Sequence, residues 1–321
     1  MTDVAVRPPS FTKDRLLTLL QDYGVYAAVV VLIAIDVSLD SNFLSLSNLR
    51  VQLYSAVPIL VVALGMALVI GTEGIDLSVG AVIALAAAVI PLYIGYGLVP
   101  AIATALLAGA ISGAVAGGLI AFGHVQPIVA TLALMIGLRG FAVILNGATA
   151  KTVTNTTLGN LGVGNWFGIP QMAWVAAVLV LLVAFLVRRT TFGRQLRAVG
   201  DNRAASALAG LPVRRVLITV YVLSGVFAAI AGILIVGNGG YADPANYGLN
   251  YELKAITAVV VGGTPLTGGK VRVLGTVAGA AFMQLIEATL IQHNIKASYE
   301  QMVEAAIIIV AVYAARGRRS R

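Results

Sequence analysis

Cysteine is absent from the 321 residues, and only two histidines occur, His124 and His293. Without cysteine the chain can form neither a disulfide nor a thiolate metal site. Two histidines so far apart in the sequence offer little to a transition metal. We therefore expect neither a bound metal nor a cofactor.

Charged residues are also scarce. They make up 11% of the chain and hydrophobic residues 59%, whereas soluble domains carry about 25% charged and roughly 45–50% apolar residues. A helix needs about 20 apolar residues to cross a hydrocarbon core of about 30 Å. Uncharged stretches of that length or longer recur at residues 53–71, 79–122 and 172–187. The composition predicts an all-α, polytopic bundle of membrane helices.

We expect about ten transmembrane helices from the apolar pattern. The expected spans are residues 23–40, 53–71, 79–97, 99–121, 126–146, 172–188, 214–236, 253–266, 273–292 and 301–315. Broken helices are expected near residues 71–80 and 261–270, where glycine and polar residues interrupt the apolar runs.

The distribution of basic residues predicts how the bundle lies in the membrane. The loop between residues 188 and 215 holds Arg188, Arg189, Arg194, Arg197, Arg203, Arg214 and Arg215, while the other long loop, residues 147–171, holds only Lys151. Cytoplasmic loops carry the excess of Lys and Arg, so the first loop is expected inside and the second outside. Arg50 is the exception. The net charge of +8 lies at the ends of apolar runs, and we expect no nucleic-acid partner.

The expected organisation is one transmembrane domain with two cytoplasmic ends. Residues 1–22 are predicted to be a cytoplasmic arm, because they lack the short apolar core and cleavage site of a signal peptide. Residues 23–315 form the transmembrane domain, with a cytoplasmic loop at 189–214, and residues 316–321 form a basic cytoplasmic tail.

The first expected break carries two carboxylates, Glu73 and Asp76, with Gly74 and Ser78 beside them. An isolated acid at mid-membrane costs about 2.5–3.5 kcal/mol on insertion scales, so it usually faces protein, water or a partner. We interpret Asp76 or Ser78 as a cap for the next helix. The alternative is contact with a transported solute.

The second expected break, residues 261–270, resembles a phosphate-binding loop only at first sight. That loop needs glycine six residues before its lysine and Ser or Thr directly after it. Here Thr264 and Val271 flank Lys270 at those positions, so we do not expect this chain to hydrolyse ATP. Thr264 remains a candidate for the break or the transport path.

The segment from residue 193 to 215 is the most hydrophilic in the chain. Gly200 with Asp201 and Asn202 predicts a turn and a helix start, residues 204–208 favour a short helix, and Gly210 ends it. Such a helix offers a soluble partner a docking surface. An ordinary connecting loop is the alternative.

Two further features have structural interpretations with functional alternatives. Gly109, Gly113 and Gly117 recur every four residues, which favours close helix packing, with the transport path as the alternative. Arg139, in the fifth span, is expected to reach outward or to form a structural pair; lining a polar path is the other possibility.

Five ordered segments carry a family resemblance that covers nearly the whole chain. They are Gly74–Gly80, Gln126–Leu132, Gly200–Gly210, Tyr221–Gly232 and Gly262–Gly269. The chain resembles the permease subunits of bacterial ABC importers for monosaccharides, of the ribose, xylose, arabinose and galactose type. In three places the chain departs from the pattern: Glu73 stands where a second glycine is usual, Pro265 and Thr267 replace serines, and Lys270 and Val271 replace a smaller turn.

The resemblance implies a channel-forming subunit in the bacterial inner membrane that is not itself an enzyme. It implies a second permease subunit, identical or paralogous, a separate ABC ATPase on the cytoplasmic side and a periplasmic sugar-binding protein outside. Carried over by position, the ATPase-coupling residues are Gly200, Asn202, Arg203, Ala204, Ala205 and Gly210. The sugar is left open.

The main rival is an ion-coupled secondary transporter. In that case the carboxylates of Asp76, Glu287 and Glu304 would form a relay for protons or cations within the membrane. A membrane enzyme would need a convergent acid, base or nucleophile set, and the spans offer none.

Overall fold

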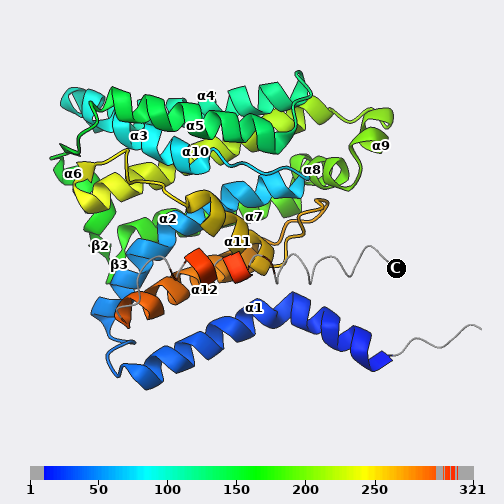
Figure 1. The fold of residues 1–321 in the computed structure, drawn as a ribbon, viewed down its shortest axis with the longest axis horizontal. Helices are drawn as coiled ribbons and strands as arrows, with labels where there is room; N and C mark the ends of the chain where they lie inside the picture. Colours follow the sequence, from blue (N-terminus) through cyan, green and yellow to red (C-terminus); the bar gives the residue numbers. More distant parts are fainter. Residues whose placement is uncertain (1–10, 294–298, 300, 304, 308, 310–321) are drawn as a thin grey trace, which may run out of the picture.

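The computed structural model describes residues 11–293, 299, 301–303, 305–307 and 309, and nearly all of its ordered elements are helices (Figure 1). The long helices are α1 (Phe11–Leu39), α2 (Leu46–Gly71), α3 (Val79–Tyr93), α4 (Leu98–Ala121), α5 (Pro127–Leu145), α7 (Gln171–Arg189), α10 (Val213–Gly239) and α12 (Val273–Gln292). The shorter ones are η1 (Ile94–Tyr96), α6 (Thr156–Val163), α8 (Thr191–Asp201), α9 (Arg203–Leu208) and α11 (Tyr251–Val261).

Within the described residues, seven helices are long and apolar enough to cross a membrane. They are Leu46–Gly71, Val79–Tyr96, Leu98–Ala121, Pro127–Leu145, Gln171–Arg189, Val213–Gly239 and Val273–Gln292. The predicted first span corresponds to a shorter apolar stretch, Gly24–Leu39, within α1. Because α1 begins at Phe11, part of the expected arm is helical.

The expected eighth span is corrected by the structure. Residues 253–266 were expected to cross the membrane, but α11 has only 11 residues. At 1.5 Å per residue it extends about 16 Å, roughly half of a hydrocarbon core of about 30 Å. The expected tenth span, 301–315, lies largely outside the described residues.

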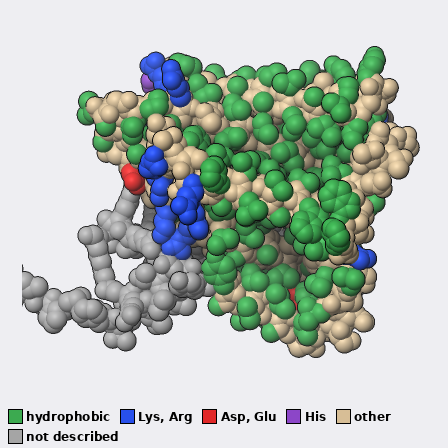
Figure 2. All heavy atoms as spheres, turned by 180° about the vertical axis from the view of Figure 1, so that it is seen from behind, with side chains coloured by type: hydrophobic (Ala, Val, Ile, Leu, Met, Phe, Trp, Pro, Cys, Tyr) green, Lys and Arg blue, Asp and Glu red, His purple; other side chains and the backbone are tan. Residues whose placement is uncertain are grey.

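The core of the bundle consists of α2, α3 and α10, and the other helices surround it. In α2, 72% of the helix's most apolar 18-residue stretch is buried inside the bundle, whereas in α5 the corresponding share is only 17%. Large apolar side chains on α4, α5 and α7, such as Ile111, Ile136 and Leu181, are exposed instead. Hydrophobic side chains accordingly cover most of the face in Figure 2, as a lipid environment requires.

The glycine stripe on α4 packs against α10. A β-carbon on Gly109 would overlap the backbone of Gly225, and one on Gly113 would overlap the backbone of Tyr221. Gly117 lies in the same way against Ile218. The three glycines therefore let the two helices approach closely, which confirms the packing interpretation.

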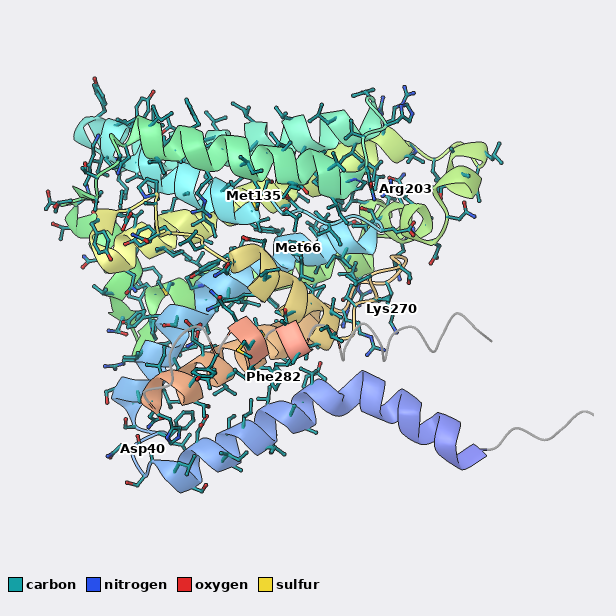
Figure 3. The ribbon with its side chains drawn as sticks, in the orientation of Figure 1. Asp40, Met66, Met135, Arg203, Lys270 and Phe282 are labelled. Atoms are coloured by element: carbon teal, nitrogen blue, oxygen red, sulfur yellow. The ribbon has the colours of Figure 1, made fainter. Side chains whose placement is uncertain are left out.

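The two ends of the bundle differ in structure and charge. α8 and α9 lie at one end, whereas α6 and four short strands lie at the other (Figure 1). Strand β1 (Lys151–Thr152) pairs antiparallel with β4 (Tyr241–Ala242), and β2 (Asn165–Trp166) pairs antiparallel with β3 (Ile169–Pro170). Most of the visible basic side chains gather at one edge of the molecule in Figure 2. Arg203 and Lys270 lie at the α8 end and Asp40 at the opposite end (Figure 3).

Arg50, the exception to the charge pattern, has a structural role at the strand end. Its Nε donates a 3.1 Å hydrogen bond to the carbonyl oxygen of Gly168, in the turn between β2 and β3. The side chain therefore ties α2 to this hairpin.

Candidate functional site

The two predicted helix breaks are present and have the same backbone geometry. α2 ends at Gly71 and α11 at Val261. After α2, Glu73 N–H donates to Ile70 O and Gly74 N–H to Val69 O; after α11, Gly263 N–H donates to Val260 O and Thr264 N–H to Val259 O. Both are Schellman motifs. The two segments, far apart in the sequence, therefore share one hydrogen-bond pattern.

Each motif places one residue in the left-handed region, and the two residues differ. Gly263 has φ of 84° and Glu73 has φ of 62°. Glycine adopts this conformation without a steric penalty, whereas other residues pay about 1–2 kcal/mol. The departure from the family pattern at Glu73 thus falls at the one position of the motif where glycine is preferred. Its side chain is exposed at the surface.

The turns that follow the two helices contact each other. Gly269 N–H donates a 3.0 Å hydrogen bond to Gly71 O. A β-carbon on Gly268 would stand 2.9 Å from the backbone nitrogen of Glu73, closer than side chains normally approach. Two segments almost 200 residues apart in the sequence therefore form one structural unit.

Gly200 lies between these two turns. A β-carbon there would overlap Gly71 O and would stand 2.5 Å from the backbone nitrogen of Gly269. A turn and helix start were expected at Gly200 with Asp201 and Asn202; α8 instead continues through Gly200 to Asp201, and the new helix begins directly after its cap, Asn202. Glycine is required here for close contact with both breaks and not for chain reversal.

The short helix predicted after Gly200 is present as α9. Asn202 caps it, accepting a 2.9 Å hydrogen bond from Ala205 N–H, and Gly210, with φ of 76°, terminates it. Ala204, Ala205 and Leu208 are exposed, and Leu208 is 91% accessible. α9 thus presents small side chains and one large apolar side chain at the surface.

Arg203 connects α9 to the first break. Its Nη2 donates a 2.8 Å hydrogen bond to Thr72 O. Together with Gly200, this bond gives the α8–α9 segment two attachments to the end of α2. We call Gly71–Gly74, Gly200–Arg203 and Gly268–Gly269 the inner junction.

Asp76 is buried just beyond the first break, with 1% of its surface exposed. Its Oδ1 accepts hydrogen bonds from the Ser78 hydroxyl at 2.6 Å and the Ser78 amide at 3.0 Å, and its Oδ2 accepts one from the Ser224 hydroxyl at 2.7 Å. The Ser78 side chain makes no capping bond to α3. Asp76 therefore holds the entry to α3 and fastens it to α10.

Neighbouring polar groups hold both breaks in place. Gly74 lies against the Tyr221 hydroxyl, and the Thr131 hydroxyl donates to Ile75 O at 3.3 Å. In the second break, the Thr264 hydroxyl accepts a 3.0 Å bond from Arg272 N–H. Thr264 is 1% exposed, so it closes its own loop.

Arg139 does not join the inner junction. Its guanidinium donates to the carbonyl oxygens of Tyr247 at 2.7 Å and Gly248 at 3.1 Å, in the loop that leads into α11. Arg139 was expected to reach outward, to form a structural pair or to line a polar path. The structural role fits these contacts best, and its partners are backbone carbonyl groups. This arginine positions the start of the half-length helix.

The carboxylates of the proposed relay have other partners. Glu287 forms a 2.7 Å ion pair with Lys254, which joins α12 to α11. Asp76 is bonded to serine side chains and a backbone amide. Glu304 lies outside the described residues.

Sequence reasoning missed the convergence itself. Ser224 lies inside a resemblance segment and was not selected, because nothing in one sequence indicates that α10 brings it to Asp76. The contact of Gly268 and Gly269 with Gly71 was missed for the same reason, since three distant loops must meet to create it. The ion pair of Lys254 with Glu287 had a detectable signal: opposite charges in two consecutive expected spans.

Comparisons with known proteins identify relatives over nearly the full length. The ribose import permease protein RbsC of Escherichia coli (strain K12) is 40% identical over 291 residues, covering 89% of this chain and 90% of that protein. The L-arabinose ABC transporter permease protein AraH of Azospirillum brasilense is 32% identical, covering 99% and 94%. The galactofuranose transporter permease protein YtfT of Escherichia coli (strain K12) is 38% identical, covering 79% and 75%. No solved structure matches.

The apolar helices and their packing define a multi-pass helical membrane protein. Residues 49–312 match the family described as branched-chain amino acid transport system permease component, and the chain belongs to that family. Its relatives are permease components of ABC transporters, so the chain is a transport subunit and not an enzyme.

Proposed function

We propose that this chain is the transmembrane subunit of an ATP-driven monosaccharide importer of the bacterial inner membrane. The relatives at 32–40% identity are named for ribose, galactofuranose and L-arabinose, which supports a sugar rather than an amino acid as cargo. The working assembly contains two permease subunits, an ABC ATPase and a periplasmic sugar-binding protein.

The inner junction is the observation that carries the proposal. α9 is exposed and short, as a docking element must be, while Gly200 and Arg203 are packed or bonded against the ends of two interrupted helices. A partner that moves α9 therefore acts on both breaks at once. We assign the ATPase to the α9 surface, with both chain termini on the same side of the membrane.

We propose that transport proceeds by alternating access. ATP binding closes the ATPase dimer, the α9 helices of the two permease subunits move with it, and the permease halves rock between inward-open and outward-open states. Gly200 transmits the movement of α9, because its backbone is in direct contact with the backbone of both Gly71 and Gly269. The binding protein docks at the end that carries α6 and the two hairpins.

Site-specific crosslinking tests the docking assignment, and the absence of native cysteine makes it direct. Ala205→Cys on α9 should crosslink to the ATPase subunit in membranes that contain the assembled transporter. Ala148→Cys, exposed at the opposite end, is the matched control and should not. Crosslinking at residue 148 with none at residue 205 would refute the assignment.

A further inference from the structure

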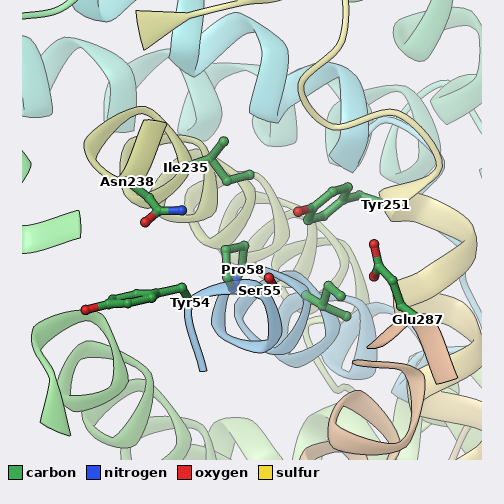
Figure 4. Close-up of a pocket in the computed structure, with 8 residues that line it drawn as sticks. Tyr54, Ser55, Pro58, Ile235, Asn238, Tyr251 and Glu287 are labelled. Atoms are coloured by element: carbon green, nitrogen blue, oxygen red, sulfur yellow. The ribbon is translucent and has the colours of Figure 1, made fainter. Parts of the chain in front are cut away.

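A polar cavity of about 170 Å³ lies between α2, α10, α11 and α12, toward the end of the bundle that carries α6 (Figure 4). Its polar lining consists of Tyr54, Ser55, Asn238, Tyr251 and Glu287. The space is large enough for several water molecules and smaller than the pockets that enclose drug-sized ligands. It is separate from the inner junction, which none of these residues joins.

The lining combines hydrogen-bonding groups with aromatic rings and holds one charged group, Glu287. Asn238 and Tyr251 point toward one another across the space in Figure 4. Glu287 is neutralised by its 2.7 Å ion pair with Lys254. The Tyr54 hydroxyl donates to Val163 O at 2.8 Å, which fixes its ring at the edge of the cavity.

Two of the polar side chains, Ser55 and Asn238, are free to form hydrogen bonds with water or a solute. Both residues are exposed, and their side chains make no hydrogen bond to any residue that the structure describes. Polar groups at membrane depth are tolerated where they line a water-filled space or meet a solute.

We infer that this cavity is a transit site for a neutral, hydroxyl-rich solute of monosaccharide size, contacted by Ser55, Asn238 and Tyr251. Amide and hydroxyl groups match sugar hydroxyls, and tyrosine rings match the apolar faces of a sugar ring. The one carboxylate of the lining is already paired with Lys254, so the lining does not favour a cation. The small size and open edge favour weak, passing contact. The inference rests on the proposed function and adds to it the place where the cargo touches the permease.

Single-cysteine labelling of the complete transporter tests the site. The assembly is reconstituted with its ATPase and binding protein, carrying Ser55→Cys or, separately, Asn238→Cys in the permease. Each is treated with a charged, membrane-impermeant thiol reagent. Uptake of D-ribose, L-arabinose and D-galactose and the ATP hydrolysis stimulated by the binding protein are then measured. Leu181→Cys, exposed on α7, is the lipid-facing control, and the unmodified permease sets the background.

The expected result is labelling at residues 55 and 238 but not at 181, with uptake reduced at least tenfold and stimulated ATP hydrolysis kept within twofold. Absence of labelling at both cavity positions, or complete labelling with unchanged uptake, would overturn the site. Equal loss of uptake and ATP hydrolysis would also overturn it, because the label would then act on assembly. If the unmodified assembly imports none of the sugars, the proposed function fails first and this inference with it.

Discussion

Gly71 and Gly269 are joined by a backbone hydrogen bond of 3.0 Å, although one ends α2 and the other follows α11. The bond couples the two helix breaks, and Gly200 of α8 is packed against both partners. Because protein interiors are close-packed, this contact cannot be changed on one side without displacing the other.

Replacing Gly200 with leucine should uncouple transport from ATP hydrolysis. Any side chain there would overlap the Gly71 carbonyl oxygen, so α8 must move away from both breaks. We expect uptake to fall at least tenfold while membrane insertion and ATP hydrolysis persist. Rates of uptake and hydrolysis in proteoliposomes measure both quantities.

The control for this variant is Gly118→Leu on α4. A β-carbon at Gly118 meets nothing within 4 Å, so this change adds the same side chain without a clash. If the Gly200→Leu variant imported sugar at the rate of the unmodified protein, the junction would not transmit movement from α9 to the helix breaks.

Replacing Glu73 with glycine should stabilise the protein. Glu73 holds φ of 62°, a conformation that costs a non-glycine residue about 1–2 kcal/mol. Part of this gain is lost to the greater freedom of glycine in the unfolded chain, so we expect a net gain of about 1 kcal/mol. Thermal unfolding in detergent measures it.

The reciprocal variant is Gly263→Ala, at the equivalent position after α11, where φ is 84°. It should lower the unfolding temperature. If both variants moved the temperature in the same direction, the two breaks would not be equivalent.

Much of the fold could be predicted from the sequence, because apolar runs and polar interruptions are local signals. The ends of α2 and α12 fall where they were expected, at Gly71 and Gln292. The sequence did not reveal that α11 spans only about half of the membrane. The length of an apolar run does not show at what depth the helix begins. In the structure, the loop held by Arg139 determines this point.

Individual residues of the candidate site were predicted from the sequence, but their contacts with one another were not. Asp76 and Gly200 were each selected, since a carboxylate and a glycine stand out in their segments. Their partners, Ser224 and Gly71, are ordinary residues of apolar helices and become significant only in the folded chain. Single-sequence reasoning therefore finds unusual residues more readily than the contacts that explain them.

Replacing Leu208 with aspartate should weaken association with the ATPase. Leu208 is 91% exposed on α9, and burial of so exposed an apolar side chain in a partner pocket favours association. We expect at least a tenfold loss of ATPase in co-purification.

Phe167→Asp is the matched control. Phe167 is 96% exposed in the turn between β2 and β3, at the opposite end of the bundle. Equal recovery of the ATPase with both variants would show that Leu208 is not an anchor.

Replacing Asp76 should distinguish a structural carboxylate from an ion relay. Asp76→Ala leaves three buried donor groups of Ser78 and Ser224 without their acceptor, at a cost of about 1–3 kcal/mol each. We expect a large drop in thermal stability. Asp76→Asn keeps the shape and an acceptor and should retain at least half of ATP-driven uptake.

A relay would behave differently. Asp76→Asn would then abolish uptake while the protein stayed folded, and a protonophore would abolish uptake by the unmodified protein. Uptake with and without protonophore, at constant ATP, separates the two outcomes.

The central claim is that an external ATPase drives transport through this chain. The most direct test is sugar uptake by proteoliposomes that contain the permease and binding protein, with and without the ATPase subunit and with proton and sodium gradients imposed. We predict concentrative uptake only when ATPase and ATP are both present. Concentrative uptake on an ion gradient without the ATPase would contradict the account.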